Sequence, residues 1–315
     1  MRRIVVVADM EGAAGIGNMP KDCFPWYPEY HDHGLVQLAG DVNAVLRGLR
    51  AGGIECIDIC DMHFMGQNLS ESQLEPVDRF PVIKLVRCSF PDWKFLEEGY
   101  DGAILLGFHA MAGTLNGFAS HTLIPFLRVR VNGQPVGEAA LIGWLCGAYN
   151  VPILMITGDE VSVKQAQEFL PSVSVLAVKK AKNREVAHCF PTEEVRRLIE
   201  ERASVATQRL EWNPVYRARE PVLIEAAFRK PEEADLAAAV PGAKKSSPRV
   251  VTYKSEKYLE AFNFLSLVCT LVESRWFAEV QRELSATQEG RRIFGGWIRR
   301  LDEQWMRDSE PFWPE

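Results

Sequence analysis

The chain has 315 residues, a formal net charge of −6 and 47% hydrophobic residues, so it is long enough for two domains and ordinary for a folded protein. The acidic balance argues against a nucleic-acid partner, because neutralising phosphates needs clustered Lys and Arg. Two basic clusters, at residues 179–182 and 299–300, lie in mixed-charge sequence, so we interpret both as solvated surface. No apolar run approaches the ~20 residues of a membrane helix, so we expect no membrane partner.

The N-terminus superficially resembles a signal peptide, because basic residues precede the apolar run at 4–8. Asp9 and Glu11 end that run, whereas a signal peptide needs an apolar region of ~7–15 residues. The cysteines are odd in number, widely spaced and without a C-x-x-C pair, which is typical of reduced thiols. We therefore expect a cytoplasmic protein.

In the first half of the chain, short apolar runs alternate with segments of helical spacing. Asn132-Gly133 supplies the left-handed positions of a type I′ turn, so a hairpin is predicted around it. The predicted strands are 4–8, 54–60, 80–86, 102–106, 126–131, 134–136 and 151–158, and the predicted helices are 35–51, 139–149 and 160–170. This alternation indicates an α/β fold with a mainly parallel sheet flanked by helices.

After about residue 172 the composition changes. Strands are predicted at 173–178, 221–228 and 249–253, helices at 192–208, 231–240 and 255–273, and one or two further helices after 279. We therefore predict three parts. Residues 1–180 form a metal-binding α/β catalytic domain, residues 181–278 a smaller α+β domain, and residues 279–315 a helical C-terminal extension.

Two carboxylates, Asp9 and Glu11, follow the first predicted strand and are separated by a single residue, Met10. Alternate residues of an extended chain point the same way, so both carboxylates can face one space. Without a cation they would repel each other and the pKa of one would rise. The alternative interpretation is an acidic loop, or the start of a helix whose dipole stabilises the negative charges.

Two of the few histidines, His63 and His109, each follow a different predicted strand. A single histidine after a strand is more often structural. The carboxyl ends of parallel strands meet at one edge of a sheet, however, and Asp9 and Glu11 lie at the same edge. Imidazole with carboxylate suits zinc, and also manganese or iron. We therefore predict a shared metal site at this edge.

Pattern alone leaves two further residues open. Glu138 lies at the start of an apolar helix, so its charge either interacts favourably with the helix dipole or serves as another carboxylate ligand. His121 follows the glycine-containing loop 113–117, where it is either a surface residue or a catalytic one. His31 and His33 lie in an acidic, aromatic stretch, and we predict a surface role for them.

Taken together, five motifs resemble the zinc-dependent D-aminopeptidases of the bacterial dipeptide-transport (Dpp) operon type. The motifs are Asp9-Met10-Glu11-Gly12, Asp61-Met62-His63, Gly107-Phe108-His109-Ala110, Ser120-His121 and Val136-Gly137-Glu138. They come in the family's order and close to its spacing, and the resemblance covers about residues 4–275. The aromatic segment 22–33 differs from the family pattern, and the loop from His109 to His121 is slightly longer.

The resemblance implies two zinc ions close together in each subunit, with manganese as an alternative metal. Asp9 would bridge the ions, Glu11, His63, His109 and Glu138 would complete their coordination, and His121 would be the catalytic histidine. The resemblance also implies a ring-like homo-oligomer, for example a decamer. That assembly would enclose its active sites and remove N-terminal D-amino acids from short peptides.

The activity we predict is that of a metal-dependent aminopeptidase or amidohydrolase. A metal-bridging hydroxide would attack the scissile carbonyl, with His121 as base, proton shuttle or oxyanion partner. Asp61 is a candidate for orienting His63. One alternative is a dinuclear amidohydrolase that acts on a non-peptide amide. The other is a noncatalytic assembly protein that retains the fold and uses the Trp-rich tail after about residue 277.

Overall fold

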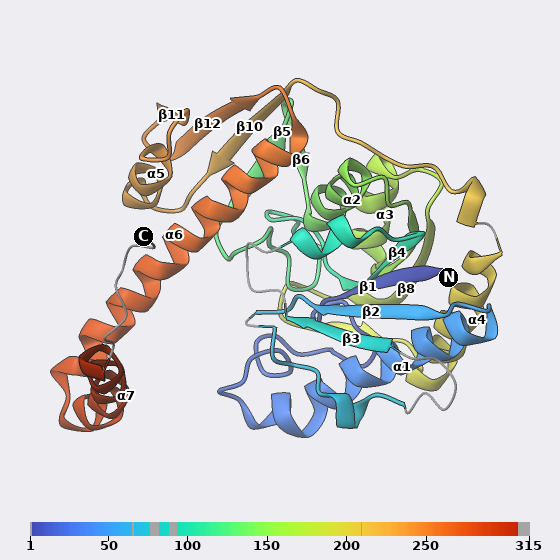
Figure 1. Ribbon diagram of the computed structural model, residues 1–315, viewed down its shortest axis with the longest axis horizontal. Coiled ribbons are helices and arrows are strands. Elements are labelled where there is room, and N and C mark those ends of the chain that lie inside the picture. Colours follow the sequence, from blue (N-terminus) through green and yellow to red (C-terminus); the bar gives the residue numbers. More distant parts are fainter. Residues whose placement is uncertain (1, 65, 76–81, 88–92, 209, 308–315) are drawn as a thin grey trace. The chain divides into compact units, whose positions relative to one another are not determined.

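The computed structural model describes residues 2–64, 66–75, 82–87, 93–208 and 210–307 (Figure 1). The chain divides into two compact units, Met1–Cys269 and Thr270–Glu315, and the boundary falls within one long helix. The first unit contains both β-sheets and every residue predicted for the site.

The larger sheet has seven strands within the described residues, in the order β3-β2-β1-β4-β7-β8-β9. Neighbouring strands are parallel, except that β9 pairs antiparallel with β8. The strands are β1 (Arg3–Ala8), β2 (Cys56–Asp61), β3 (Val82–Arg87), β4 (Gly102–Phe108), β7 (Ile153–Asp159), β8 (Ser174–Ala181) and β9 (Ala187–Cys189). Every residue of β2, β4 and β7 is buried, as expected for parallel strands covered on both faces.

Two pairs of helices flank this sheet, one pair on each face (Figure 1). The helices α1 (Leu35–Ala51) and α4 (Thr192–Thr207) pack together on one face, and the main apolar core lies between them and the strands. The helices α2 (Glu138–Ala148) and α3 (Glu160–Phe169) contact each other and the opposite face. The α/β fold with a mainly parallel, helix-flanked sheet is therefore confirmed.

The smaller sheet is antiparallel and has the order β11-β12-β10-β5-β6 within the described residues. Its elements are β5 (Arg128–Val131), β6 (Gln134–Val136), β10 (Val222–Ala227), α5 (Pro231–Ala238), β11 (Lys244–Ser247) and β12 (Val250–Ser255). The predicted hairpin is present as β5 and β6, and both Asn132 and Gly133 have the positive φ that the turn requires.

The two sheets do not follow the division at residue 180 that the composition suggests. β9 and α4 come after that residue but belong with the larger sheet, whereas β5 and β6 come before it but belong to the smaller one. Composition along the chain does not register strand pairing between distant segments. The boundaries at 180 and 278 therefore stay a prediction about folding units.

The second unit contains the end of α6 (Tyr258–Ala286) and α7 (Gln288–Arg307). The sequence predicts that the first of these helices ends at 273, but it continues for several more turns. Short helical turns at Tyr30–Gly34, Glu71–Gln73, Lys94–Glu98 and Leu210–Trp212 connect longer elements. In the described part of the chain, no helix combines the length and apolar character needed to span a membrane.

Candidate metal centre

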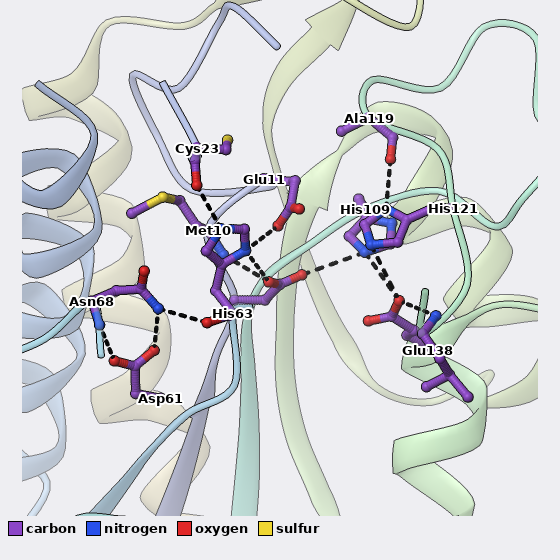
Figure 2. Close-up of polar contacts among 12 residues, drawn as sticks. Met10, Glu11, Cys23, Asp61, His63, Asn68, His109, Ala119, His121 and Glu138 are labelled. Atoms are coloured by element: carbon purple, nitrogen blue, oxygen red, sulfur yellow. Dashed lines mark hydrogen bonds and ion pairs between the residues drawn. The ribbon is translucent and has the colours of Figure 1, made fainter. Parts of the chain in front are cut away.

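The first cluster consists of Asp9, Glu11 and His63, which follow the adjacent strands β1 and β2 and are all buried. His63 Nδ1 lies 2.9 Å from Glu11 Oε2 (Figure 2). The same nitrogen lies 3.3 Å from Asp9 Oδ1. His63 Nε2 donates to the carbonyl of Cys23 at 2.7 Å. That bond assigns the proton to Nε2 and leaves Nδ1 facing the carboxylates, which is the arrangement of a metal-binding imidazole.

The second cluster consists of His109, His121 and Glu138. The two imidazole rings are stacked, with centroids 3.9 Å apart and planes 10° from parallel. His109 Nε2 lies 3.3 Å and His121 Nε2 lies 3.7 Å from Glu138 Oε1 (Figure 2). Each Nδ1 faces a backbone carbonyl, that of Ala110 at 3.1 Å and that of Ala119 at 2.8 Å. Both Nε2 atoms are therefore directed at the carboxylate.

The carboxylate of Asp9 joins the two clusters. Its Oδ1 faces His63 Nδ1 at 3.3 Å, and its Oδ2 faces His109 Nε2 at 3.5 Å. The five residues predicted as metal ligands and His121 are thus gathered at the carboxyl edge of the larger sheet. One carboxylate with an oxygen toward each of two clusters has the geometry of a bridging ligand.

Two glycines allow the segments that carry these clusters to lie against each other. Gly12 N donates to Gly107 O at 2.7 Å, and a Cβ on Gly12 would lie 1.9 Å from Phe108 O. Gly107 has φ +77°, and a Cβ there would meet Asp9 O at 2.1 Å. Any larger side chain would force the loop after β1 away from the loop after β4. The motif glycines therefore set the distance between the clusters.

Burial and mutual charge shift the pKa values of this site. Burial and the neighbouring Glu11 raise the pKa of Asp9 to about 7. Burial would lower the pKa of His109, but the carboxylates of Glu138 and Asp9 outweigh it and raise that pKa to about 10. Burial also opposes the charged form of His63, yet Glu11 and Asp9 raise its pKa well above the ordinary value. Without a metal, the protonated His63 and His109 thus offset the negative charge of the carboxylates.

Two buried atoms at the centre of the site support a bound cation. Asp9 Oδ2 and His109 Nε2 are both inaccessible to solvent and make no hydrogen bond of good geometry, although they face each other at 3.5 Å and His109 Nε2 lies 3.3 Å from Glu138 Oε1. Leaving buried polar atoms without partners costs ~1–3 kcal/mol each, so such atoms are rare unless an ion or ligand serves them. The donor set of imidazole and carboxylate is the one that zinc prefers. The residues present therefore fit a metal centre.

His121 differs from the other five residues because 17% of its side chain is exposed. It lies on a loop in which Ala119 and Leu123 both have positive φ, a conformation that costs non-glycine residues ~1–3 kcal/mol each. Asp159 fixes the start of this loop, since its Oδ2 accepts from Phe118 N at 3.1 Å. Burial and then the charge of His109 lower the pKa of His121, so its Nε2 is an available proton acceptor near neutral pH.

Asn68 is a supporting residue that the sequence pattern does not reveal. Its Nδ2 donates to the backbone carbonyl of His63 at 2.7 Å and to Asp61 Oδ1 at 2.8 Å (Figure 2). Asp61 also accepts from the backbone N–H groups of Asn68 and Leu69. Asp61 therefore acts on the position of His63 through Asn68, rather than through the imidazole directly.

Lys179 is a second supporting residue, and its predicted place in a solvated basic cluster is wrong. The side chain is fully buried, and its Nζ donates to Glu11 O at 2.7 Å and to Ile16 O at 2.6 Å. Nζ also lies 5.0 Å from the ring centroid of Phe118. Lys179 thus ties the loop of the first cluster to the segment that leads to His121, whereas Lys180 is exposed as expected.

The remaining histidine predictions concern His31 and His33, which lie outside both clusters. His31 is exposed and pairs with the carbonyl of Pro25 at 2.8 Å. His33 pairs with the carbonyl of Gly15 at 2.9 Å. His31 therefore lies on the surface as predicted, whereas His33 is only half-buried, and each ring contacts a backbone carbonyl.

Comparisons with known proteins identify relatives along most of the chain. A family model described as D-aminopeptidase (Peptidase_M55) matches residues 1–267. A D-aminopeptidase of Bacillus subtilis (strain 168) is 28% identical over 273 residues, which cover 85% of this chain and 97% of that protein. The solved structure of the zinc-dependent D-aminopeptidase DppA from Bacillus subtilis, described as a self-compartmentalizing protease, is similar with a TM-score of 0.77 and 26% identity. That match covers 87% of this chain and 98% of DppA.

Proposed function

The chain belongs to the D-aminopeptidase family, and from that premise we propose that it is a zinc-dependent aminopeptidase that removes the N-terminal residue, of D configuration, from short peptides. Membership of this family makes the protein a hydrolytic enzyme, so a noncatalytic assembly role is not favoured. The observation that carries the proposal is the position of Asp9 between two histidine-carboxylate clusters.

We propose that each subunit holds two zinc ions. Asp9 would bridge them, Glu11 and His63 would complete one site, and His109 and Glu138 the other. The buried Asp9 Oδ2 and His109 Nε2 support this assignment, because neither makes a hydrogen bond of good geometry and a cation between them would satisfy both. Zinc held by such ligands supplies a Lewis acid that activates water and polarises a carbonyl. Manganese is the alternative, since it accepts the same donor types.

We assign proton transfer to His121. Its Nδ1–H is held by Ala119 O, which directs Nε2 toward Glu138 and the centre of the site. The lowered pKa keeps the ring neutral near pH 7, so Nε2 can accept a proton from the attacking water. The same nitrogen would then deliver that proton to the departing amino group. Partial exposure lets the ring exchange protons with solvent between turnovers.

We further propose a homo-oligomer that encloses its active sites. DppA is described as a self-compartmentalizing protease, and this chain covers nearly all of it. A cytoplasmic location stays a prediction from cysteine usage. For the oligomer, we expect a ring-like decamer. Native mass spectrometry of the purified protein measures the subunit number, and a monomer would contradict the enclosed assembly.

Metal analysis tests the proposal most directly. We expect plasma emission spectroscopy of the purified protein to find two zinc ions per chain. Hydrolysis should be lost after chelation and should recover when zinc is added. His109→Ala is expected to lower the metal content, whereas His31→Ala, at an exposed histidine outside both clusters, provides the control. Less than one transition-metal ion per chain, with activity unaffected by chelators, would contradict the proposal.

A substrate panel separates this activity from that of a related amidohydrolase. Zinc-loaded enzyme is offered peptides that begin with D-Ala or L-Ala, and β-linked amides, at matched concentrations. We expect the D-Ala peptides to have the highest kcat/KM. Faster hydrolysis of a non-peptide amide would instead favour a dinuclear amidohydrolase with the same metal centre.

A further inference from the structure

Three aromatic side chains form a partly exposed surface cluster, which we call the aromatic patch: Phe24, Trp26 and Phe64. Phe24 and Trp26 are stacked, with centroids 4.9 Å apart and planes 5° from parallel. Phe64 meets both rings edge-on, at 5.8 Å and 5.7 Å. Trp26 is 62% exposed and Phe64 is 37% exposed. Clustered aromatic rings left in water commonly mark a contact surface.

The aromatic patch is directly attached to the first cluster. Phe64 follows His63 in the chain, and Phe24 follows Cys23, whose carbonyl accepts the Nε2–H of His63. The ring centroids of Phe24 and His63 are 6.0 Å apart. This separation is about the reach of one amino-acid side chain, so we infer that a peptide bound at the histidines would bring a side chain within range of the patch.

The structure holds the aromatic patch in place. Phe64 has φ +51°, a left-handed backbone conformation that bulky residues rarely adopt. Asn68 maintains it by bonding to the carbonyl of His63, and Tyr30 OH in turn donates to Asn68 Oδ1 at 2.7 Å. Backbone strain supported by a buried polar network is typical of preformed binding surfaces.

The chemistry of the aromatic patch selects an uncharged ligand. The three rings carry no ionisable group, and the adjacent Lys21 and Glu29 are paired with each other at 3.4 Å. We propose that the patch binds a large apolar or aromatic side chain of the peptide substrate, on one side of the scissile amide. This inference rests on the proposed peptidase function and adds a substrate preference that is built by the residues around position 24.

A Trp26→Ala variant tests the aromatic patch. The zinc-loaded enzymes are compared on D-Phe-D-Ala, D-Ala-D-Phe and D-Ala-D-Ala, which present the aromatic side chain on either side of the amide. We expect kcat/KM for one of the aromatic peptides, relative to D-Ala-D-Ala, to fall about tenfold in the variant, the loss that one aromatic contact supports. Trp212→Ala removes an 84% exposed tryptophan elsewhere and is expected to leave this ratio unchanged.

A binding measurement separates this inference from the peptidase proposal. Calorimetric titration of zinc-loaded enzyme with free D-phenylalanine and D-alanine compares the same side chains without turnover. Weaker binding of D-phenylalanine alone in Trp26→Ala would support the patch even if no peptide is cleaved. Equal losses for all ligands would overturn the inference. A smaller assembly with unchanged ligand ratios would also overturn it, because the patch would then be a contact between copies of the chain.

Discussion

The two clusters of the metal centre are constructed in different ways. In the first cluster, both ring nitrogens of His63 have partners on other segments of the chain, Glu11 on one side and Cys23 on the other. In the second cluster, His121 bonds only two residues back, to Ala119, and remains partly exposed. This difference fits the proposed roles, in which the first cluster holds a metal ion and the second both holds one and exchanges protons with solvent through His121.

Substitution of His121 should give the largest effect on turnover. We expect His121→Ala to lower kcat by ~10²–10⁴-fold, because positioned acid-base groups contribute that much. Zinc content by plasma emission should be retained, since Asp9, His109 and Glu138 keep their donors. Steady-state assays with the exposed His31→Ala as control measure the effect. Turnover within a factor of two of the parent would remove His121 from the chemistry and erase the contrast between the clusters.

A change behind the first cluster should instead weaken metal binding. We expect Asn68→Ala to lower zinc affinity by ~10–100-fold, because His63 loses the group that fixes its backbone. At saturating zinc, kcat should recover. Competition with a zinc-binding dye gives the affinities.

The matched control for this test is Asn43→Ala. That side chain makes equivalent bonds, to Gln73 O and from Glu75 N, farther along the connection after β2 and with residues that belong to neither cluster. If Asn43→Ala weakened zinc binding as much as Asn68→Ala, general destabilisation would be the better explanation.

The smallest expected effect is a shift of the acidic limb of the kcat/KM profile to lower pH. Burial lowers the pKa of His121 below its ordinary value of 6.5, and a neighbouring positive charge, whether the proton on His109 or a bound zinc ion, acts in the same direction. A general base must be neutral, so activity is retained above this pKa and lost as the pH falls through it. The acidic limb of kcat/KM for the zinc-loaded enzyme should therefore lie below pH 6.5. A limb above pH 7 would assign the proton acceptor to another group.

The sequence predicts the site because the site lies where strands end. Parallel strands bring their carboxyl ends to one edge, so the positions of Asp9, Glu11, His63 and His109 in the sequence are enough to group them. Glu138 and His121 lie on a helix start and a loop, whose position depends on packing. For those two, the pattern left alternatives open and the family motifs were needed.

Other features depend on contacts that no local pattern contains. The charged sequence around Lys179 predicts a solvated side chain, yet Lys179 is buried. Its ammonium group can be buried because it donates hydrogen bonds to the carbonyls of Glu11 and Ile16, which are far away in sequence. The hairpin of β5 and β6 was predicted, but its partner strand β10 lies about ninety residues later. Composition could not reveal this pairing, so it could not show which sheet the hairpin joins.

The hairpin also has a consequence for the chemistry. β6 ends at Val136 and α2 begins at Glu138, so Gly137 alone separates the smaller sheet from a carboxylate of the second cluster. Gly137 is extended, which leaves no slack between them. The position of the smaller sheet therefore constrains where the Glu138 carboxylate can lie, so the antiparallel sheet is part of the framework of the second cluster.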